Sequence, residues 1–238
     1  MTSAIILAGG LGMRLRQAVP DLPKPMAPID GRPFLEYQMD HWIGQGVRRF
    51  VLSVGYRHEL IEQHFGTTYG GADIAYAVEA SPLGTGGGLL LAMDKLGPAG
   101  PCLVLNGDTY FDVSLAELRK FHDANRAQIT LSLFAVENNT RYTGVGIDHA
   151  QRITRLKSTG DGGRQLINGG VYFLSETALS GLPYRIGDQA SFENDILENA
   201  LQAGKHLYGC PFRGKFIDIG VPEDYTRAAS LLNNRRGV

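Results

Sequence analysis

The sequence predicts an α/β protein with a Rossmann-like architecture, in which helices flank a mainly parallel mixed sheet. Short apolar segments alternate with helical patterns along the first half of the chain, an order typical of parallel sheets covered by helices on both faces. Glycine-rich segments follow several of the apolar segments, at the position where such sheets bind ligands. The 238 residues are enough for one sizeable hydrophobic core.

The first half of the chain alternates regularly between strand and helix patterns. Strands are predicted at residues 3–8, 49–54, 74–79 and 102–105, and helices at 33–45, 58–65 and 87–96. Pro33 suits the first turn of the first helix. Since parallel strands end at a common edge, the segments 9–16, 80–86 and 106–108 are expected to converge on one rim.

The second half is less regular. Strands are predicted at residues 128–136, 144–148, 166–174 and 215–219, a Gly-rich turn at 158–164, and helices at 191–203 and 222–232. In the helix at 191–203, Phe192, Ile196 and Ala200 share an apolar face. No internal repeat and no linker-like stretch divides the sequence, so we expect one domain over residues 1–238.

Composition argues against several classes of function. The net charge is −1, so no overall attraction to nucleic acid or to an anionic membrane is expected. No apolar run approaches the ~20 residues that span a bilayer, and the short apolar segment 5–8 lacks the features of a signal peptide. Cys102 and Cys210 have no metal-ligand spacing, which indicates buried, reduced thiols in a cytoplasmic protein.

The segment after the first predicted strand carries the chemistry of a phosphate site. Residues 9–16 read GGLGMRLR, and Lys24 follows between two prolines. Glycines let backbone N–H groups approach an anion, arginine adds a planar fork, and proline stiffens the loop around the lysine. A Walker loop is excluded because Arg14-Leu15 replaces its Lys-Ser/Thr, and the dinucleotide fingerprint lacks its third glycine. Asp30 is interpreted as part of a tight turn rather than as a ribose-binding acid.

The pattern AGGLGxRL at residues 8–15, followed by PKP at 23–25, resembles the signature of the sugar-1-phosphate nucleotidyltransferases. The resemblance covers nearly the whole chain and implies transfer of a nucleotidyl group from an NTP to a sugar 1-phosphate. It implies catalytic contacts to phosphate from Arg14 and Lys24, both expected on a solvent-facing loop. The other implied nucleotide-binding residues of this segment are Leu7, Ala8, Gly9, Gly10, Gly12 and Met13. Met13 replaces the family's usual Thr or Ser, so a weaker auxiliary contact is expected there.

Two aspartates are candidate metal ligands. Asp108 ends a predicted strand at the rim, and Asp218 lies in an apolar strand where an unpaired charge would be costly. Taken alone, they suggest a turn or capping residue and a buried ion pair. Both segments match the family's metal-binding positions, so the resemblance implies catalytic Asp108 and Asp218 as ligands of Mg²⁺, which takes one or two carboxylates plus phosphate oxygens. The neighbouring Asn106 and Gly107 are implied to contact the nucleotide.

Residues 79–87, with the sequence EASPLGTGG, resemble the family's base-binding loop. The implied nucleotide-binding residues are Glu79, Pro82, Leu83, Gly84 and Thr85. A carboxylate at position 79 could accept hydrogen bonds from both N1–H and the amino group of guanine, which favours GTP. Two alternatives stay open: related uridylyltransferases also carry Glu here, and a Glu on an edge strand can simply be solvated.

Sugar recognition is expected from the second half of the chain. Residues 168–172 (NGGVY) and 191–193 (SFE) match segments that hold sugar hydroxyls in the family. Amides and carboxylates pair well with the vicinal diols of a sugar. The implied sugar-binding residues are Asn168, Gly169, Gly170 and Glu193. Many relatives carry Glu-Lys shortly before the Asn-Gly-Gly strand, whereas this chain has Ser158-Thr159. Lys157 or Arg164 is therefore left to contact the sugar phosphate.

Within this family, the chain is most similar to the guanylyltransferases that act on D-glycero-α-D-manno-heptose 1-phosphate. This resemblance implies a nucleotide-binding part over about residues 1–112 and a sugar-binding part over about 113–238. It implies GTP and the sugar 1-phosphate as partners and a GDP-heptose for cell-surface polysaccharide as the product. Open alternatives are mannose 1-phosphate or an N-acetylated sugar as acceptor, UTP as donor, and a non-catalytic nucleotide-sugar sensor. Whether the chain forms a homo-oligomer also stays open.

Overall fold

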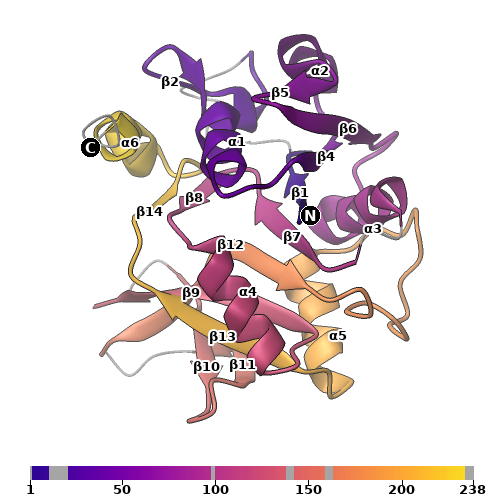
Figure 1. Cartoon of the computed structure of the whole chain (residues 1–238), viewed down its shortest axis with the longest axis vertical. Coiled ribbons are helices and arrows are strands. Elements are labelled where there is room, and N and C mark those ends of the chain that lie inside the picture. The colour runs from indigo at the N-terminus through magenta and orange to yellow at the C-terminus, as the bar shows by residue number, and fades with distance from the viewer. Residues whose placement is uncertain (1, 11–20, 98–99, 138–141, 159–162, 234–238) are drawn as a thin grey trace.

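The computed structural model describes residues 2–10, 21–97, 100–137, 142–158 and 163–233 (Figure 1). Its strands are β1 (Ser3–Leu7), β2 (Pro28–Ile29), β3 (Arg32–Pro33), β4 (Arg49–Val54), β5 (Thr68–Tyr69), β6 (Ala72–Val78), β7 (Cys102–Asn106), β8 (Thr109–Phe111), β9 (Ile129–Val136), β10 (Gly144–Ile147), β11 (Ile153–Ser158), β12 (Gln165–Leu174), β13 (Leu207–Phe212) and β14 (Phe216–Asp218). Its helices are α1 (Phe34–Gly44), α2 (His58–Phe65), α3 (Gly84–Leu96), α4 (Leu115–Ala124), α5 (Leu197–Gln202) and α6 (Pro222–Asn233), with a 3-10 turn η2 (Lys24–Met26) and a π-helical turn η3 (Phe192–Ile196).

A mixed sheet forms the centre of the described structure. Its strand order is β11-β10-β12-β7-β1-β4-β6-β5, with β9 beside β12 and β13 beside β9. Strands β7, β1, β4 and β6 run parallel, whereas β12 joins β7 antiparallel. The predicted α/β fold with a mixed sheet flanked by helices is confirmed, and most of its parallel strands belong to the first half of the chain.

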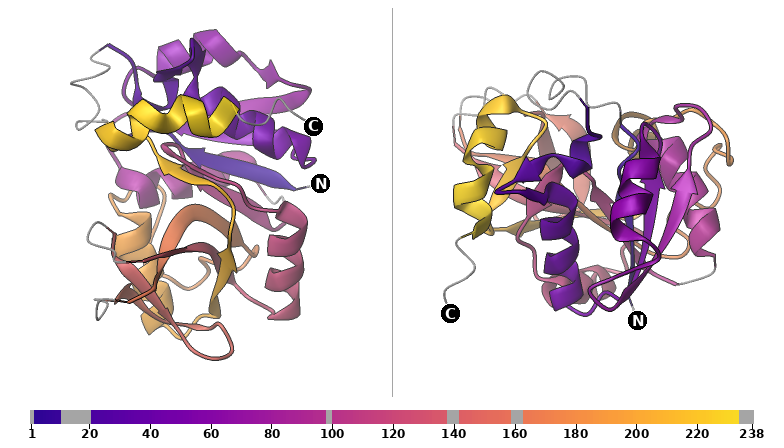
Figure 2. Two further views of the ribbon diagram at one scale, coloured as in Figure 1. Left: turned by 90° about the vertical axis from the view of Figure 1, so that its left-hand side faces the viewer. Right: turned by 90° about the horizontal axis from the view of Figure 1, so that it is seen from above.

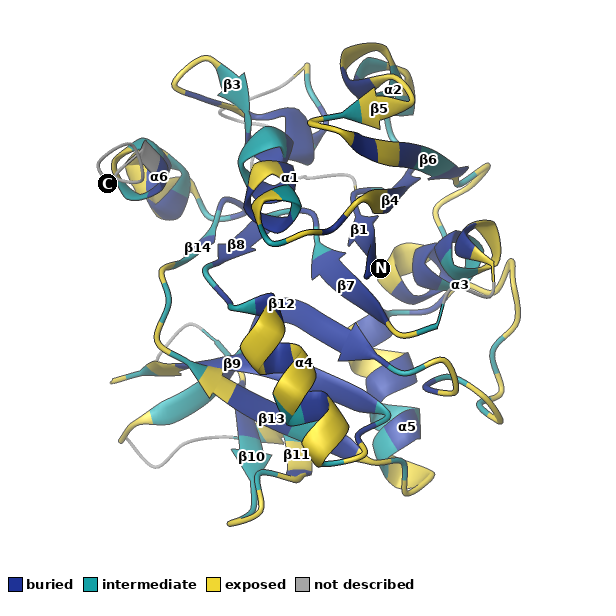
Figure 3. Ribbon diagram, viewed as in Figure 1, coloured by how far each residue is buried: buried dark blue, intermediate teal, exposed yellow. Residues whose placement is uncertain are grey.

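Strand β1 shows how both faces of the sheet are covered. Ala4 and Ile6 pack into a core shared with α1, α2 and α4, while Ile5 and Leu7 pack into a core shared with α3, η3 and α5. Figure 3 shows β1 and most of β7 as buried; β7 is only partly buried at its last residue, Asn106. A strand covered on both faces reads as a continuous apolar run, which is why residues 4–7 predicted it clearly.

The last helix returns to the beginning of the chain (Figure 2). In α6, Ala228 shares an apolar core with Ala27 and Phe34, and the Tyr225 hydroxyl donates a hydrogen bond of 2.8 Å to the Pro28 carbonyl oxygen. Strand β14, just before α6, pairs antiparallel with β8. The end of the chain therefore contributes directly to the rim formed by the first half.

Several elements differ from the sequence-based expectations. Strands β8, β11 and β13 and helix α4 were not predicted. Helix α4 begins with a Ser-x-x-Glu pattern, and the Ser114 hydroxyl accepts a hydrogen bond from the Glu117 N–H at 3.3 Å. Helix α3 begins at Gly84 rather than at residue 87. Asp30 and Gly31 have φ angles of 47° and 78° in the β2–β3 turn, which confirms the interpretation of this segment as a turn.

The described residues bear on two expectations from composition, one about membrane-spanning segments and one about the cysteines. Within them, no helix is long and apolar enough to cross a membrane. Cys102 and Cys210 are free thiols and both are buried. Burial raises the pKa of Cys102 to about 11, and burial together with the charge of Glu117 raises the pKa of Cys210 to about 12. The expectation that both thiols are buried is therefore confirmed.

Candidate active site

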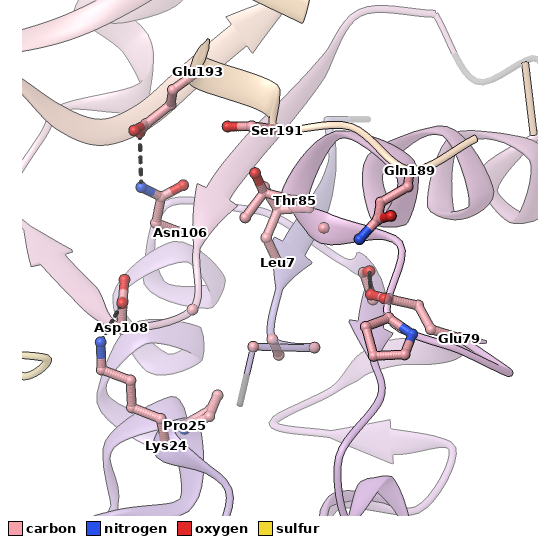
Figure 4. Close-up of a pocket in the computed structure, with 17 residues that line it drawn as sticks. Leu7, Lys24, Pro25, Glu79, Thr85, Asn106, Asp108, Gln189, Ser191 and Glu193 are labelled. Atoms are coloured by element: carbon pink, nitrogen blue, oxygen red, sulfur yellow. Dashed lines mark hydrogen bonds and ion pairs between the residues drawn. The ribbon is translucent and has the colours of Figure 1, made fainter. Parts of the chain in front are cut away.

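A cavity of about 500 Å³ lies at the carboxyl ends of the parallel strands (Figure 4). It is lined by the segments predicted to converge, together with residues from η2, β4 and the segment before η3. The lining residues are Leu7, Ala8, Gly9, Gly10, Lys24, Pro25, Ser53, Glu79, Pro82, Gly84, Thr85, Asn106, Gly107, Asp108, Gln189, Ser191 and Glu193. Leu83 is not among them. Gly12, Met13 and Arg14 lie outside the described residues, so their predicted phosphate contacts stay predictions.

The ends of three neighbouring strands are tied together beneath this cavity. The Ala8 N–H donates to the Ser53 carbonyl oxygen at 2.8 Å, and the Gly107 N–H donates to the Leu7 carbonyl oxygen at 3.0 Å. A Cβ atom at position 107 would lie only 2.6 Å from that Leu7 oxygen, so glycine is required for this approach. The ends of β1, β4 and β7 therefore form one connected floor of the cavity.

Lys24 and Asp108 form an ion pair at one end of the cavity (Figure 4). The Lys24 side chain is only 12% exposed and that of Asp108 is 34% exposed. The expectation that Lys24 lies on a solvent-facing loop is therefore wrong. The reason is the segment after β14, where Gly220 lies against the Lys24 ammonium, a contact that the local Pro-Lys-Pro pattern does not report.

Asp218 lies beside the same lysine. Asp218 pairs with Thr109 in the β14–β8 ladder. Its side-chain Oδ1 accepts a hydrogen bond of 2.7 Å from the Gly220 N–H. A Cβ atom built at Gly220 would lie 2.8 Å from Oδ1 of Asp218 and would collide with the Lys24 ammonium. The two predicted metal ligands therefore both lie close to the Lys24 ammonium, although they are separated by 110 positions in the sequence.

The carboxylate of Glu79 is half-buried and already has two partners in the protein. Its Oε2 accepts the Leu83 N–H at 2.8 Å, and its Oε1 lies 3.4 Å from the Ser53 hydroxyl, which donates to it. Burial raises the pKa of Glu79, opposed by these two hydrogen bonds. Glu79 therefore lines the cavity and also holds the loop that follows β6.

A second cavity of about 320 Å³ adjoins the first and shares Glu193 with it. Its lining combines apolar side chains with hydroxyl, amide and charged groups from several strands. The lining residues are Leu131, Tyr142, Thr143, Val145, Leu156, Lys157, Ile167, Asn168, Glu193, Asn194, Leu197, Asp218 and Val221. Of the predicted sugar-binding residues, Lys157, Asn168 and Glu193 line it, whereas Gly169 and Gly170 do not. Lys157 is 58% exposed, with its ammonium 3.9 Å from a Glu198 oxygen.

Glu193 is held at the boundary of the two cavities by side chains from β7 and β12. Its Oε1 accepts hydrogen bonds from the amides of Asn106 at 3.3 Å and Asn168 at 3.1 Å. The Tyr172 hydroxyl donates to the same oxygen at 2.5 Å. Tyr172 is fully buried, and burial together with the charge of Glu193 raises its pKa well above the usual value. The hydroxyl therefore stays protonated as a donor.

The two glycines of β12 act on this arrangement indirectly. Asn168 and Tyr172 pair with Leu133 and Leu131, so residues 169–171 of β12 lie opposite the single residue Ser132 of β9 and form a bulge that includes both glycines. Gly170 has a φ of +71°, which favours glycine, and its N–H donates to Oδ1 of Asn168 at 3.1 Å. The bulge brings Asn168 within 2.8 Å of the Tyr172 hydroxyl, so these glycines position the amide rather than line the cavity.

Several residues of the site were missed by the sequence interpretation. Ser53 and Gln189 line the first cavity and were not predicted. Ser191, which also lines it, and Tyr172, which orients Glu193, were predicted only as parts of the segments 191–193 and 168–172, without a role of their own. A signal for Tyr172 was present, because a tyrosine in a buried strand needs a partner for its hydroxyl. Ser53 and Gln189 carry no comparable local pattern. Among the described residues, no group of three or more His, Cys, Asp or Glu side chains could hold a metal ion, so a metal here would depend on few carboxylates.

Comparison with known proteins places this geometry in a family. The nucleotidyl transferase profile matches residues 3–235. The chain is 41% identical over 97% of its length to D-glycero-alpha-D-manno-heptose 1-phosphate guanylyltransferase of Aneurinibacillus thermoaerophilus, covering 98% of that protein. It is 37% identical over 97% of its length to the Campylobacter jejuni enzyme of the same name, covering 99% of it.

A solved structure is similar over the same extent. The crystal structure of HddC from Yersinia pseudotuberculosis has a TM-score of 0.83 at 34% identity, covering 97% of this chain and 99% of HddC. The complex of HddC with GMP-PN has a TM-score of 0.82. With a family profile that matches nearly every residue and relatives that match from end to end, the chain belongs to the nucleotidyl transferase family.

Proposed function

We propose that this protein transfers the GMP group of GTP to D-glycero-α-D-manno-heptose 1-phosphate, which yields GDP-heptose and pyrophosphate. One observation carries the proposal: two adjoining cavities share Glu193, and the cluster of Lys24, Asp108 and Asp218 borders both. A nucleotide in the first cavity and a sugar 1-phosphate in the second would bring their phosphates together at this cluster. The full-length similarity to two heptose 1-phosphate guanylyltransferases supports the identity of both substrates.

The reaction is a displacement at the α-phosphorus of GTP. A phosphate oxygen of the sugar 1-phosphate attacks this phosphorus, and the bond to the β-phosphate oxygen breaks, so that pyrophosphate leaves. Such chemistry depends mainly on positioning two anions and on stabilising the charge that develops. Lys24 is suited to this role because its ammonium is fixed at the end of the nucleotide cavity. Arg14, on the glycine-rich loop, is proposed to contact the leaving phosphates.

The acidic cluster fits Mg²⁺. Asp108 is ion-paired with Lys24, and Asp218 lies close to the same ammonium. Mg²⁺ is often bound by one or two carboxylates plus substrate phosphate oxygens and water. We infer that these two residues would hold the ion. Mg²⁺ bound there would neutralise part of the phosphate charge. Lys24, which is paired with Asp108 in this structure, would then be released to contact a phosphate.

Glu79 is the proposed reader of guanine. It lines the nucleotide cavity, and a carboxylate can accept more hydrogen bonds than the two it receives from Leu83 and Ser53. Charge-assisted acceptance of the guanine N1–H and amino group would favour GTP over UTP, whose base presents one N–H there. In the second cavity, Asn168 and Glu193 are the proposed contacts to sugar hydroxyls and Lys157 the contact to the sugar phosphate.

The alternatives are closely related reactions. Mannose-1-phosphate guanylyltransferase of Mycobacterium tuberculosis is 33% identical, but the chain spans 64% of its length. The likeness to a UTP-bound enzyme of Acinetobacter baumannii, at 19% identity, concerns the fold alone. A non-catalytic sensor is disfavoured, because a sensor would need neither the two carboxylates nor the lysine beside them. The division into parts at about residue 112 and the cytoplasmic location stay predictions of the sequence.

A substrate matrix tests the proposal. Purified protein with MgCl₂ is given each of GTP, UTP, ATP and CTP with each of heptose 1-phosphate, mannose 1-phosphate and glucose 1-phosphate, and pyrophosphate release is followed. We expect the highest kcat/KM for GTP with heptose 1-phosphate. A preference for mannose 1-phosphate or UTP would replace the assigned substrate, and no release with any pair would contradict catalysis.

A further inference from the structure

The loop that opens α3 is locked to the segment that precedes η3, although the two are far apart in sequence. The Ala190 N–H donates to the Leu83 carbonyl oxygen at 2.9 Å, and the N–H groups of Gly86 and Gly87 donate to the Ala190 carbonyl oxygen at 2.8 and 3.3 Å. A Cβ atom at Gly86 would lie 2.9 Å from the same oxygen. The base-binding loop and the chain segment that leads to Glu193 therefore move as one unit.

Thr85 completes this contact with its side chain. Its Oγ1 accepts a hydrogen bond of 2.9 Å from the Phe192 N–H, across 107 residues of sequence. Phe192 is the first residue of η3, and the first N–H groups of a helical segment have no partner within it. Phe192 is also fully buried, so without Thr85 its N–H would lack an acceptor and water could not replace it.

The position of Phe192 bears directly on Glu193. The Phe192 ring packs edge-on against the Tyr172 ring, with a centroid distance of 4.9 Å, and the Tyr172 hydroxyl donates to Glu193. A shift of the Phe192 backbone would therefore displace the next residue and disturb the group that orients its carboxylate. In Figure 4, Thr85 and Ser191 lie close together on the wall of the cavity, between Glu193 and Gln189.

From these contacts we infer that Thr85 is a positioning residue for the sugar 1-phosphate, although it lies in the nucleotide-binding loop. Its hydroxyl oxygen fixes the backbone of Phe192, and this fixes Glu193 where it can accept hydrogen bonds from sugar hydroxyls. The inference rests on the proposed role of Glu193 in sugar binding. It differs from the role that the sequence resemblance implies for Thr85, which is contact with the nucleotide.

Two substitutions separate these roles. Thr85→Val keeps the shape of the side chain and removes the acceptor, and Thr85→Ser keeps the acceptor. We expect Thr85→Val to raise the KM and Kd for the preferred sugar 1-phosphate by about 10-fold, with the KM for GTP within about 2-fold of wild type. Thr85→Ser should restore the sugar 1-phosphate values. A rise confined to the KM for GTP would overturn the inference and support a direct nucleotide contact.

A double-substitution cycle tests whether Thr85 acts through Glu193. In the Glu193→Gln background, where sugar binding is already weakened, Thr85→Val should raise the sugar 1-phosphate Kd by less than about 2-fold, because coupled residues are not additive. Full additivity would overturn the inference. Hydrogen exchange of the Phe192 amide provides a readout that needs no catalysis. If the Phe192 amide is protected equally in wild type and Thr85→Val, the inference is wrong, whether or not the protein is active. If no substrate pair releases pyrophosphate, only the proposed function is contradicted.

Discussion

The two adjoining cavities of the candidate active site are built in different ways. The larger one is lined by short contiguous segments that end neighbouring strands, and much of its surface is glycine loop and backbone. The smaller one is lined mainly by side chains from β9 to β12, η3 and β14. The nucleotide cavity is therefore encoded in local motifs, whereas the sugar cavity depends on long-range strand pairing. Differences in acceptor specificity within such a family can then arise without change in the phosphate-binding loops.

The largest effect is expected where the two cavities meet. Asp108→Asn and Asp218→Asn should each lower kcat by at least ~100-fold, because losing one carboxylate of a two-carboxylate metal site weakens stabilisation of the transition state. Steady-state pyrophosphate release with a MgCl₂ titration measures this loss. Asp73→Asn, an exposed position on β6, is the matched control and should retain wild-type kcat. Near-normal turnover in a folded Asp218→Asn protein would contradict a catalytic role for Asp218 and thus for strand β14.

Lys24→Met is expected to have the next largest effect. It removes an ammonium that is paired with Asp108 and lies close to Asp218, so kcat/KM should fall by ~10–100-fold, as is typical for charged hydrogen bonds. The variant should also melt at a lower temperature without metal, since Asp108 and Asp218 would then repel each other. Added MgCl₂ should raise its Tm more than it raises that of the wild type. An equal rise in both proteins would place the metal elsewhere.

Glu79→Gln distinguishes base reading from loop support. If Glu79 reads guanine, kcat/KM for GTP should fall by about 10-fold or more, or about 1.4 kcal/mol, while that for UTP changes little. An equal fall for both nucleotides would mean that Glu79 acts only by holding the Leu83 N–H. Glu79→Asp is a useful control, because it keeps the charge but shortens the reach to that N–H.

The Glu79→Gln variant also predicts how stability depends on pH. Burial raises the pKa of Glu79 in the folded protein above its usual 4.5, so the wild type loses stability as the pH rises through the folded pKa. Glu79→Gln cannot ionise and lacks this loss. The Tm of the variant relative to wild type should therefore increase as the pH is raised above about 4.5. A difference that stays constant with pH would show that the carboxylate ionises without cost.

The smallest effect is expected at the outer edge of the sugar cavity. Lys157→Ala removes an exposed ammonium whose ion pair with Glu198 spans 3.9 Å, and such pairs contribute ~0–1 kcal/mol to stability. The Tm should therefore hardly change, while the KM for the sugar 1-phosphate should rise by roughly 5–10-fold if Lys157 contacts its phosphate. Lys215→Ala, another exposed lysine, serves as the control. An unchanged KM would leave this role to Arg164.

The sequence predicted the cavity built from local motifs better than the cavity built from long-range strand pairing. The run of apolar residues in β1 and the glycine pattern after it are local features, and they predicted the strand, the rim and most of the nucleotide cavity. The hydrogen bonds that hold Glu193 could not be predicted in the same way. Their donors lie on β7 and β12 and come together only when the sheet forms. The burial of Lys24 likewise depends on the return of β14.

The most direct test of the account is the stereochemistry at the α-phosphorus of GTP. Adjoining cavities that share Glu193 require both substrates to be bound together and the sugar 1-phosphate to attack directly. With a single diastereomer of GTP carrying sulfur at the α-phosphorus, phosphorus NMR of the GDP-sugar product should show inversion of configuration at that atom. Retention of configuration would indicate two successive displacements through a covalent nucleotidyl-protein intermediate, and it would contradict direct transfer between the two cavities.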